Sequence, residues 1–422
     1  MIEKDTIKHL ILEHQQRVVD IAFQERVYPI ESNLNYVFTG LRRAGKSYMM
    51  YQQIRHMLDA GHAKEEILYF NFEDERIVSL LTEDLDSIKI CFEEMYDVRP
   101  LFFLDEIQVV DHWEKFARRL ADQGYRVYVA GSNARMLSHE IATTLGGRYV
   151  VQHIEPYSFV ETLVSKGFDV HDKNFIYRHH KDISKAYEIY FRFGGLPEII
   201  ALTDKRAWLS NLYQKILLGD LVTRYQVRNP YALQVLIRKL ASSIKQPTSF
   251  NRLANIVSSS GKKISTDTVI DYLGYIQESF LVFSVENIAA KLVDKLSNKK
   301  YYFSDNGILN LFLIDPLTSL LENQVAIQLR RQYGEEFYFF HRGIEVDFYV
   351  PAEYLAIQVC YSLLDIETRR REVSALLQLS KQIKVDQMVI ITKDEEETIN
   401  EAGFNIEVIP VWKWLLKMKN EE

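Results

Sequence analysis

A short apolar run, a glycine-bounded turn and a helical pattern follow one another between residues 35 and 61, and this order constrains the fold most. The run NYVFTG ends at Gly40, and the helical pattern opens at Lys46 and stops at Gly61. Three further short apolar runs alternate with helix-like segments, at residues 67–72, 101–104 and 127–130. Such alternation is typical of strands buried in a parallel sheet with helices on both faces. The sequence therefore predicts an α/β domain over residues 1–160, beginning with an amphipathic helix over residues 1–30.

The turn between the first run and its helix reads GLRRAGKS and satisfies the pattern G-x-x-x-x-G-K-[ST]. In this P-loop pattern, glycines let backbone N–H groups wrap phosphates, the lysine reaches the β and γ oxygens, and the serine binds Mg²⁺. The N-terminus of the following helix adds its positive dipole end. An incidental glycine-rich turn is the alternative. The sequence predicts an ATP and Mg²⁺ site formed by Gly40, Leu41, Arg42, Arg43, Ala44, Gly45, Lys46, Ser47 and Tyr48.

Two adjacent acids, Asp105 and Glu106, follow the apolar run at residues 101–104. Asp105 is expected to hold Mg²⁺ through water, together with Ser47. Glu106 is expected to orient and polarise the attacking water, which indicates hydrolysis rather than phosphate transfer. The run at residues 67–72 is expected to separate the P-loop strand from the Asp-Glu strand, as in AAA-like hydrolases. A strand-end acidic turn without a catalytic role is the alternative.

The fourth apolar run ends in Gly131-Ser132-Asn133, where a polar side chain would reach the γ-phosphate and the attacking water. Ser132 is the first candidate for this sensor and Asn133 the second, with a helix cap as the alternative. Arg148 is a candidate arginine finger, a device worth about 10³–10⁵ in turnover. A finger acting between subunits would require a homo-oligomer. Other candidates for the finger are Arg135, Arg42 and Arg43, and a surface salt bridge is the alternative for Arg148.

The remaining chain divides by pattern into three parts. Residues 161–245 are mainly helical, with a break at the sequence GGLP. Residues 246–316 contain two helix patterns and two strand-like runs, which is the order of a winged helix. Residues 317–422 alternate helices and apolar runs again, so a second α/β domain is predicted there.

Positive charge is concentrated in the middle of the chain. Residues 205–300 hold fifteen Lys and Arg against six Asp and Glu, a net charge of +9. The rest of the chain must therefore carry −16 to give the overall net charge of −7. This distribution suggests contact with double-stranded DNA, and a solvated basic face is the alternative. The predicted recognition helix, residues 266–279, carries three acids, which argues against deep insertion into a groove. The lysines expected to contact phosphates are Lys262, Lys263, Lys291, Lys295, Lys299 and Lys300.

Several motifs, in order, carry a resemblance to a known family: GLRRAGKS, YFNFEDE, LFFLDEIQ, AGSNARML, LGGRY, PYSFVETL, FRFGGLPE and HRGIEVDFYV. The chain resembles, over nearly its whole length, the prokaryotic AAA-type ATPases that carry a C-terminal domain of unknown function. The resemblance implies an ATPase domain, a winged-helix segment and a C-terminal fold similar to restriction endonucleases.

Restriction-type nucleases place a helical Glu, a strand-end Asp and an acid-x-Lys pair around Mg²⁺. Glu322 and Asp347 fall at the first two places, but Gln358 and Cys360 replace the acid and the lysine. No Lys occurs between residues 301 and 380, and three arginines, at 369–371, are distant substitutes. The domain is therefore expected to keep the fold without hydrolysis, the alternative being an unusual site that uses Glu322, Glu345 and Asp347.

Composition and the first residues of the sequence argue against two classes of protein, membrane and secreted proteins. No stretch approaches the roughly 18 apolar residues of a membrane span, and the first residues lack the pattern of a secretory signal. The two cysteines, far apart, fit a reducing cytoplasm. The sequence thus predicts a cytoplasmic, Mg²⁺-dependent ATPase coupled to a winged helix and a degenerate nuclease-like domain, acting on DNA. The alternatives are an ATP-dependent nuclease and a slow nucleotide switch that recruits a protein partner.

Overall fold

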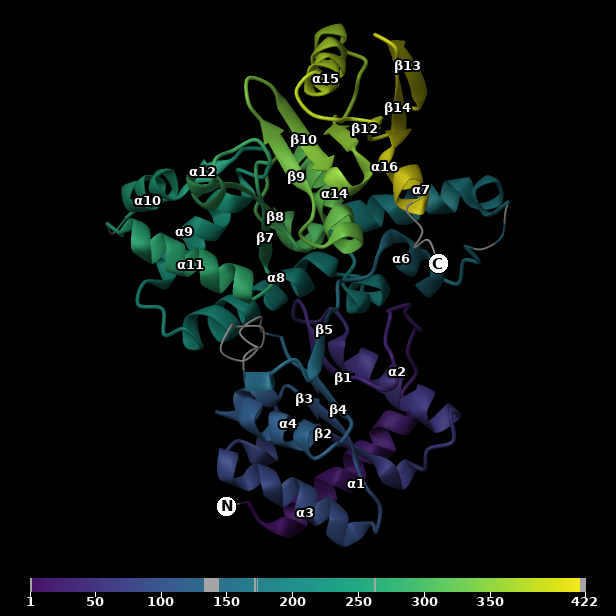
Figure 1. Ribbon diagram of the computed structural model, residues 1–422, viewed down its shortest axis with the longest axis vertical. Helices are drawn as coiled ribbons and strands as arrows, with labels where there is room; N and C mark the ends of the chain where they lie inside the picture. Colours follow the sequence, from purple (N-terminus) through teal and green to yellow (C-terminus); the bar gives the residue numbers. More distant parts are fainter. Residues whose placement is uncertain (1, 133–143, 171, 173, 262, 418–422) are drawn as a thin grey trace. The chain divides into compact units, whose positions relative to one another are not determined.

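The computed structural model describes residues 2–132, 144–170, 172, 174–261 and 263–417. The chain divides into two compact units (Figure 1). The first unit comprises residues Met1–Glu155 and Glu278–Phe280, and the second comprises Pro156–Gln277 and Leu281–Glu422. Three residues named in the predictions, Asn133, Arg135 and Lys262, lie outside the described residues. Every helix in the described ranges is too short or too polar to span a bilayer.

The first unit contains a five-stranded parallel sheet in the order β2-β3-β4-β1-β5. Its strands are β1 (Asn35–Thr39), β2 (Ile67–Asn71), β3 (Leu101–Asp105), β4 (Val127–Ala130) and β5 (Tyr149–His153). The predicted parallel α/β architecture is confirmed. One detail is wrong, because β4 and not the run at residues 67–72 separates the P-loop strand from the Asp-Glu strand. The run forms β2 at the sheet edge, where β3 is its one partner among the described strands.

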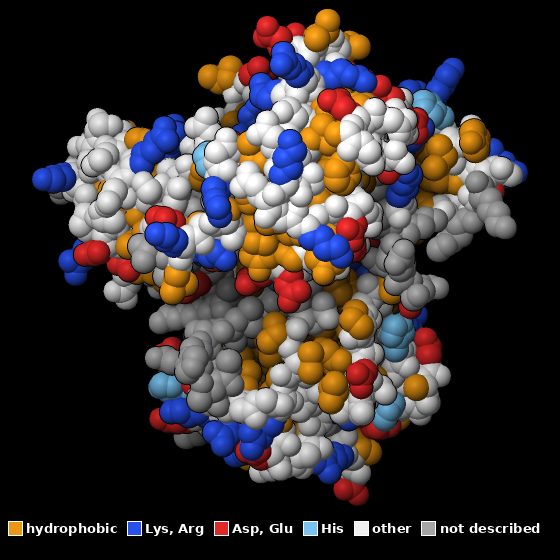
Figure 2. Space-filling model, turned by 45° about the horizontal axis from the view of Figure 1, so that its top comes forward, with side chains coloured by type: hydrophobic (Ala, Val, Ile, Leu, Met, Phe, Trp, Pro, Cys, Tyr) orange, Lys and Arg blue, Asp and Glu red, His pale blue; other side chains and the backbone are white. Residues whose placement is uncertain are grey.

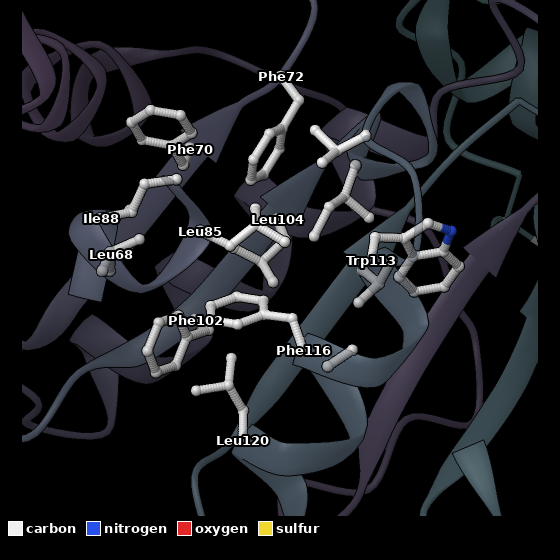
Figure 3. Close-up of a cluster of buried hydrophobic side chains, with 14 of the residues drawn as sticks. Leu68, Phe70, Phe72, Leu85, Ile88, Phe102, Leu104, Trp113, Phe116 and Leu120 are labelled. Atoms are coloured by element: carbon white, nitrogen blue, oxygen red, sulfur yellow. The ribbon is translucent and has the colours of Figure 1, made fainter. Parts of the chain in front are cut away.

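In the described part of this unit, four helices cover the sheet: α1 (Lys4–Asp20), α2 (Lys46–Asp59), α3 (Leu85–Met95) and α4 (Trp113–Asp122). The side chains of β1, β2, β3 and β4 are buried on both faces, so each face needs a helical cover. In α4 the apolar residues recur at helical spacing and face inward. Figure 3 shows a hydrophobic core of this unit, in which α3 and α4 pack on β2 and β3. The labelled side chains are Leu68, Phe70, Phe72, Leu85, Ile88, Phe102, Leu104, Trp113, Phe116 and Leu120.

The second unit begins with a helical region. Its helices are α6 (Phe159–Ser165), α7 (Phe175–Phe193), α8 (Lys205–Lys215) and α9 (Pro230–Ala241), with a π-helical segment at Ile216–Thr223. The predicted break is present, since α7 ends at Gly194, whose φ of 77° lies in the region that favours glycine. The neighbouring Gly195 is also constrained, because a Cβ there would lie 2.1 Å from the Tyr157 carbonyl oxygen.

The next region follows the predicted order of helix, helix and two strands. It consists of α10 (Phe250–Ser259), α11 (Thr266–Glu278), β7 (Val282–Val285) and β8 (Asn298–Phe303), with α12 (Leu292–Ser297) between the two strands. β7 and the short β6 (Thr248–Ser249) both pair antiparallel with β8. The winged-helix assignment stays a prediction. Lys300 does not meet the expectation of a phosphate contact, because its side chain is fully buried in β8.

The last region holds a mixed six-stranded sheet in the order β13-β14-β12-β11-β10-β9. Its strands are β9 (Tyr338–His341), β10 (Glu345–Val350), β11 (Leu355–Val359), β12 (Gln387–Thr392), β13 (Glu397–Glu401) and β14 (Phe404–Pro410). The helices of this region are α13 (Asn306–Leu309), α14 (Leu317–Tyr333), α15 (Ile366–Leu379) and α16 (Val411–Lys417). A second α/β region is therefore present, and its likeness to nucleases stays a prediction.

Candidate nucleotide-binding site

The strand register brings the predicted site residues to one edge of the first sheet. Phe38 of β1 lies opposite Ala130 of β4, and Ala130 lies opposite Asp105 of β3. The P-loop, Ser132 and Glu106 each follow directly after one of these strand ends. Because the carboxyl ends of parallel strands share an edge, the three segments meet there, where α/β sheets bind ligands.

The P-loop backbone adopts conformations that its glycines permit. Gly40 has φ 142° and Gly45 has φ 104°, and between them Arg43 has φ 69°. A Cβ on Gly40 would lie 2.2 Å from the carbonyl oxygen of Ile154, so only glycine fits. Since Gly45 precedes the first turn of α2 and has no side chain, the N–H groups of that turn receive no side-chain cap. Such N–H groups are the donors that bind phosphate at helix N-termini.

Lys46 folds its side chain back into the loop. Its ammonium donates to the carbonyl oxygens of Gly40 at 3.2 Å and Leu41 at 3.1 Å, and only 5% of the residue is exposed. The cation is therefore held inside the loop that would receive phosphates. Arg42 reaches across the same edge to Glu73 at the end of β2, 3.3 Å away. Tyr48, in the first turn of α2, is half exposed.

Asp105 is buried at the end of β3 and its two carboxyl oxygens have different environments. Oδ2 accepts a hydrogen bond from the Tyr69 hydroxyl at 2.6 Å, and the Tyr51 hydroxyl lies 3.2 Å from that of Tyr69. Oδ1 is buried and has no hydrogen-bond partner among the described residues. Burial and the neighbouring Glu106 raise the pKa of Asp105 to about 6, against the lowering effects of Tyr69, Ser47 and Lys46.

These residues fit a Mg²⁺ ion. Asp105 Oδ1 is a buried acceptor that lacks a donor, and the Ser47 side chain is near enough to lower the pKa of this carboxyl. A carboxylate and a hydroxyl oxygen are ligands that Mg²⁺ takes, usually with several waters. A carboxylate with one oxygen free of a donor, close to the serine of the P-loop, suits such an ion.

Glu106 and Ser132 meet as expected. Glu106 has φ 55°, a left-handed conformation that is uncommon for a residue other than glycine. Its Oε2 accepts from both the N–H and the hydroxyl of Ser132 at 3.3 Å, and from the side chain of Gln108. The strained turn directs the carboxylate toward the end of β4. The roles of Glu106 as base and of Ser132 as sensor stay predictions.

Arg148 lies away from this edge. Tyr149 pairs with Asn35 at the start of β1, whereas the P-loop leaves β1 at its other end. The Arg148 side chain pairs with Asp122, and the Asn35 amide donates to the Arg148 carbonyl oxygen at 3.3 Å. The fold therefore does not bring Arg148 to the P-loop of its own chain. A finger role requires a second copy.

Arg26 supports the P-loop from within the protein and was not among the predicted residues. Its guanidinium donates to the carbonyl oxygen of Ala44 at 3.2 Å and to that of Glu155 at 2.9 Å. Gln52 of α2 bonds the Arg26 backbone in both directions, at 3.0 and 2.8 Å. Arg26 thus connects the loop, the helix after it and the segment after β5.

The acids predicted for the C-terminal region are also brought together. Glu322 of α14, and Glu345 and Asp347 of β10, all lie within 3.5 Å of the Lys300 ammonium. The Gln358 amide instead donates to Glu372 at 2.8 Å, and the Cys360 thiol donates to the Ser362 carbonyl oxygen. The cation beside these acids is Lys300, which lies one residue before the range 301–380 in which the sequence has no lysine.

Two family models match separate parts of the chain. Residues 32–163 match the model of an AAA domain, and residues 184–318 match a domain of unknown function. An uncharacterized protein of Methanocaldococcus jannaschii, MJ1544, is 32% identical, with 99% of this chain and 95% of that protein covered. This chain belongs to the MJ1544 family. An uncharacterized protein of Haemophilus influenzae is 30% identical over 90% of this chain and 94% of its own length.

Solved structures show more distant likeness. The Walker-type ATPase PABY2304 of Pyrococcus abyssi is 12% identical, with a TM-score of 0.42 over 74% of this chain and 96% of that one. The Orc1 protein of Aeropyrum pernix, in complex with DNA, is 12% identical, with a TM-score of 0.29 over 78% of this chain and 94% of that one. The AAA-domain match and the P-loop geometry identify the first unit as an AAA-type P-loop ATPase domain.

Proposed function

We propose that the first unit binds ATP with Mg²⁺ and hydrolyses it. One observation carries the proposal: the P-loop lysine, a buried carboxylate with an unpaired oxygen and a second acid bonded to Ser132 meet at one edge of the sheet. Each is the residue type that phosphate binding, metal binding and water activation need. The acid next to Asp105 favours hydrolysis over transfer to another substrate.

Phosphate binding, metal binding and orientation of the attacking water are assigned to different residues of this chain. The Lys46 ammonium exchanges its two carbonyl contacts for phosphate oxygens, and the N–H groups of the α2 first turn bind the same phosphates. Ser47 and Asp105 hold the metal ion, which supplies charge neutralisation between the phosphates. Glu106 accepts hydrogen bonds from the attacking water and orients it, while Ser132 contacts the γ-phosphate. Tyr69 keeps the Asp105 carboxylate in place.

Nucleotide binding by two variants tests the assignment. Lys46→Ala removes the loop cation and is expected to abolish ATP binding, as measured by calorimetry in Mg²⁺. Glu106→Gln keeps the loop and the metal ligands, so it is expected to bind ATP with wild-type affinity. Equal affinity of Lys46→Ala and the wild type would contradict the proposed phosphate site. Lys8→Ala, a change on α1 away from the loop, serves as the control.

We infer further that the ATPase acts on double-stranded DNA through the basic segment, residues 205–300. Eight of its bases are exposed: Arg206, Lys215, Arg228, Arg238, Lys245, Arg252, Lys263 and Lys291. Lys299, Lys300 and Arg224 instead lie beside carboxylates of the protein. Asp267 and Asp271 are exposed on α11, which favours backbone contacts over groove insertion.

Figure 2 shows Lys and Arg side chains spread over the visible face among acidic and hydrophobic ones. Dispersed bases that contact only phosphates give affinity that depends on salt and carries no sequence choice. If six phosphates are contacted, affinity is expected to fall about 10³-fold between 50 and 200 mM salt.

ATP turnover with and without DNA separates this proposal from its alternative. Stimulation at low salt that fades as salt rises, and that Arg238→Glu with Arg252→Glu removes, would support it. Lys381→Glu, an exposed lysine outside the segment, is the matched control. Turnover indifferent to DNA at every salt concentration would favour a slow nucleotide switch that recruits a protein partner.

A further inference from the structure

One lysine of the second unit lies at the centre of three carboxylates. The Lys300 ammonium is 3.1 Å from Glu345 Oε1, 3.3 Å from Glu322 Oε1 and 3.5 Å from Asp347 Oδ1. The lysine side chain has no exposed surface and that of Glu322 is 3% exposed, while Asp347 and Glu345 form the outer side at 16% and 42%. Three elements contribute to this lysine cluster: β8 supplies the base, and α14 and β10 supply the acids.

Other groups hold the carboxylates in this arrangement. The Tyr302 hydroxyl donates to Glu322 Oε1 at 2.8 Å, and the Val359 N–H donates to Asp347 Oδ2 at 2.9 Å. The face of the Phe339 ring lies 5.5 Å from the ammonium, a cation–π contact that adds to its stabilisation. Each acid therefore directs one oxygen at the lysine, and for Glu322 and Asp347 further hydrogen bonds fix this placement.

Two of the three arginines at residues 369–371 pair with acids outside the lysine cluster. Arg371 pairs with Glu372 at 2.6 Å, and Arg369 donates to Glu397 at 2.8 Å. The Gln358 amide oxygen accepts from the Asp347 N–H at 2.8 Å and its nitrogen donates to Glu372, so the amide stays outside the cluster. Lys300 contacts all three of Glu322, Glu345 and Asp347, whereas the His341 imidazole lies 3.9 Å from Glu345 Oε2.

The distances around Lys300 identify the kind of cation that the cluster accommodates. Oxygens bind Mg²⁺ at about 2.0–2.1 Å and Ca²⁺ at about 2.3–2.6 Å, whereas N–H···O contacts extend to about 3.2 Å. The oxygens stand 3.1–3.5 Å from the central nitrogen, which is longer than metal–oxygen bonds and close to the spacing around an ammonium. Consistent with this, no group of three His, Cys, Asp or Glu side chains among the described residues is arranged to hold a metal ion.

We propose that the Lys300 ammonium takes the place of a divalent cation in this carboxylate cluster. The C-terminal region thereby has a permanent internal cation, which joins β8 to α14 and β10 without a metal. The three carboxylates outweigh burial and raise the pKa of Lys300, so the ammonium keeps its charge near neutral pH. Removing the ammonium would leave three carboxylates free to close on a divalent ion.

Mn²⁺ binding to the full chain without nucleotide tests the proposal. Mn²⁺ takes the oxygen ligands of Mg²⁺ and is counted directly by electron paramagnetic resonance. Wild type and Asp347→Asn are expected to bind equal amounts. Lys300→Met is expected to bind one additional Mn²⁺, with an affinity at least tenfold higher than any Mn²⁺ binding by the wild type. The double variant Lys300→Met, Asp347→Asn is expected to lack this additional ion. Lys299→Met, the neighbouring lysine paired with Glu286, is the matched control.

Two results would overturn the proposal. Mn²⁺ that binds to the wild type and is lost in Asp347→Asn would show that the cluster holds a metal with its lysine in place. A folded Lys300→Met protein without additional Mn²⁺ would show that the carboxylates are not a cation site. If Lys300→Met unfolds, Lys300→Gln, which keeps a polar group among the acids, repeats the measurement, and the wild-type comparison stands independently.

Discussion

Replacing Tyr69 by Phe tests how the fold sets the charge of Asp105. The Tyr69 hydroxyl donates to Asp105 at 2.6 Å inside the protein, where this carboxyl has a pKa raised to about 6 by burial and by Glu106. A donor stabilises the ionised carboxylate, so its removal is expected to raise this pKa further. A carboxyl group such as that of Asp105 can bind Mg²⁺ only when it is deprotonated. The variant is therefore expected to lose metal affinity at neutral pH and regain it at alkaline pH.

The size of the effect follows from the hydrogen bond. A bond to a charged group contributes about 1.5–3 kcal/mol, and one pKa unit corresponds to about 1.4 kcal/mol, so Tyr69→Phe should raise the pKa by about 1–2 units. Asp105 would then titrate near pH 7–8. At pH 7 its ionised fraction would fall from about nine-tenths to between a half and a tenth, a two- to tenfold loss of Mg²⁺ affinity.

The assay is the Mg²⁺ dependence of ATP turnover from pH 5.5 to 9. In the wild type, the Mg²⁺ concentration that gives half-maximal turnover should rise roughly tenfold per pH unit below pH 6, because one proton competes with the ion. In Tyr69→Phe this rise should begin at a higher pH than in the wild type. Tyr51→Phe removes a hydroxyl that is one step further from Asp105, so its rise should begin at a pH closer to that of the wild type. Identical pH profiles for Tyr69→Phe and wild type would refute the reasoning.

Two further changes test the loop itself. Gly40→Ala places a Cβ 2.2 Å from the Ile154 carbonyl oxygen, at a residue whose φ is 142°, so this change should abolish ATP binding and lower Tm. Gly219→Ala, where a Cβ would have open space, is the control and should leave ATP binding intact. Arg26→Met leaves the buried carbonyls of Ala44 and Glu155 without their donor and should cost about 2–4 kcal/mol in urea unfolding. Wild-type stability of Arg26→Met would show that the loop does not depend on this support.

The sequence predicted the parts of the ATP site that are local. A P-loop and an Asp-Glu pair are recognisable because phosphate and metal binding require fixed residue types at fixed spacing. The sheet order was not predicted correctly, since β4 lies between β1 and β3 through pairing of distant segments. Tyr69 and Arg26 gave no signal, because Tyr69 acts 36 residues away from Asp105 and Arg26 acts 129 residues away from Glu155.

Lys300 shows why a search along the sequence missed a residue of the lysine cluster. The sequence has no lysine between residues 301 and 380, the range that holds Glu322, Glu345 and Asp347, so no lysine was expected beside these acids. The base instead comes from β8, a strand of another sheet, and reaches Glu345 across 45 residues of sequence. Lys300 was expected on the wing because the strand-like run KKYYFSD falls in the β-hairpin of the predicted winged helix. Position in space, which the sequence pattern does not encode, determines its charge partners.

The measurement that tests the central claim most directly is phosphate release from saturating Mg²⁺-ATP by the wild type and by Glu106→Gln. The account predicts steady turnover by the wild type and loss of nearly all of it in the variant, which still binds ATP. Equal turnover by the two proteins would contradict the assignment of Glu106 as the residue that orients the attacking water. Absence of turnover in both would contradict hydrolysis by this P-loop.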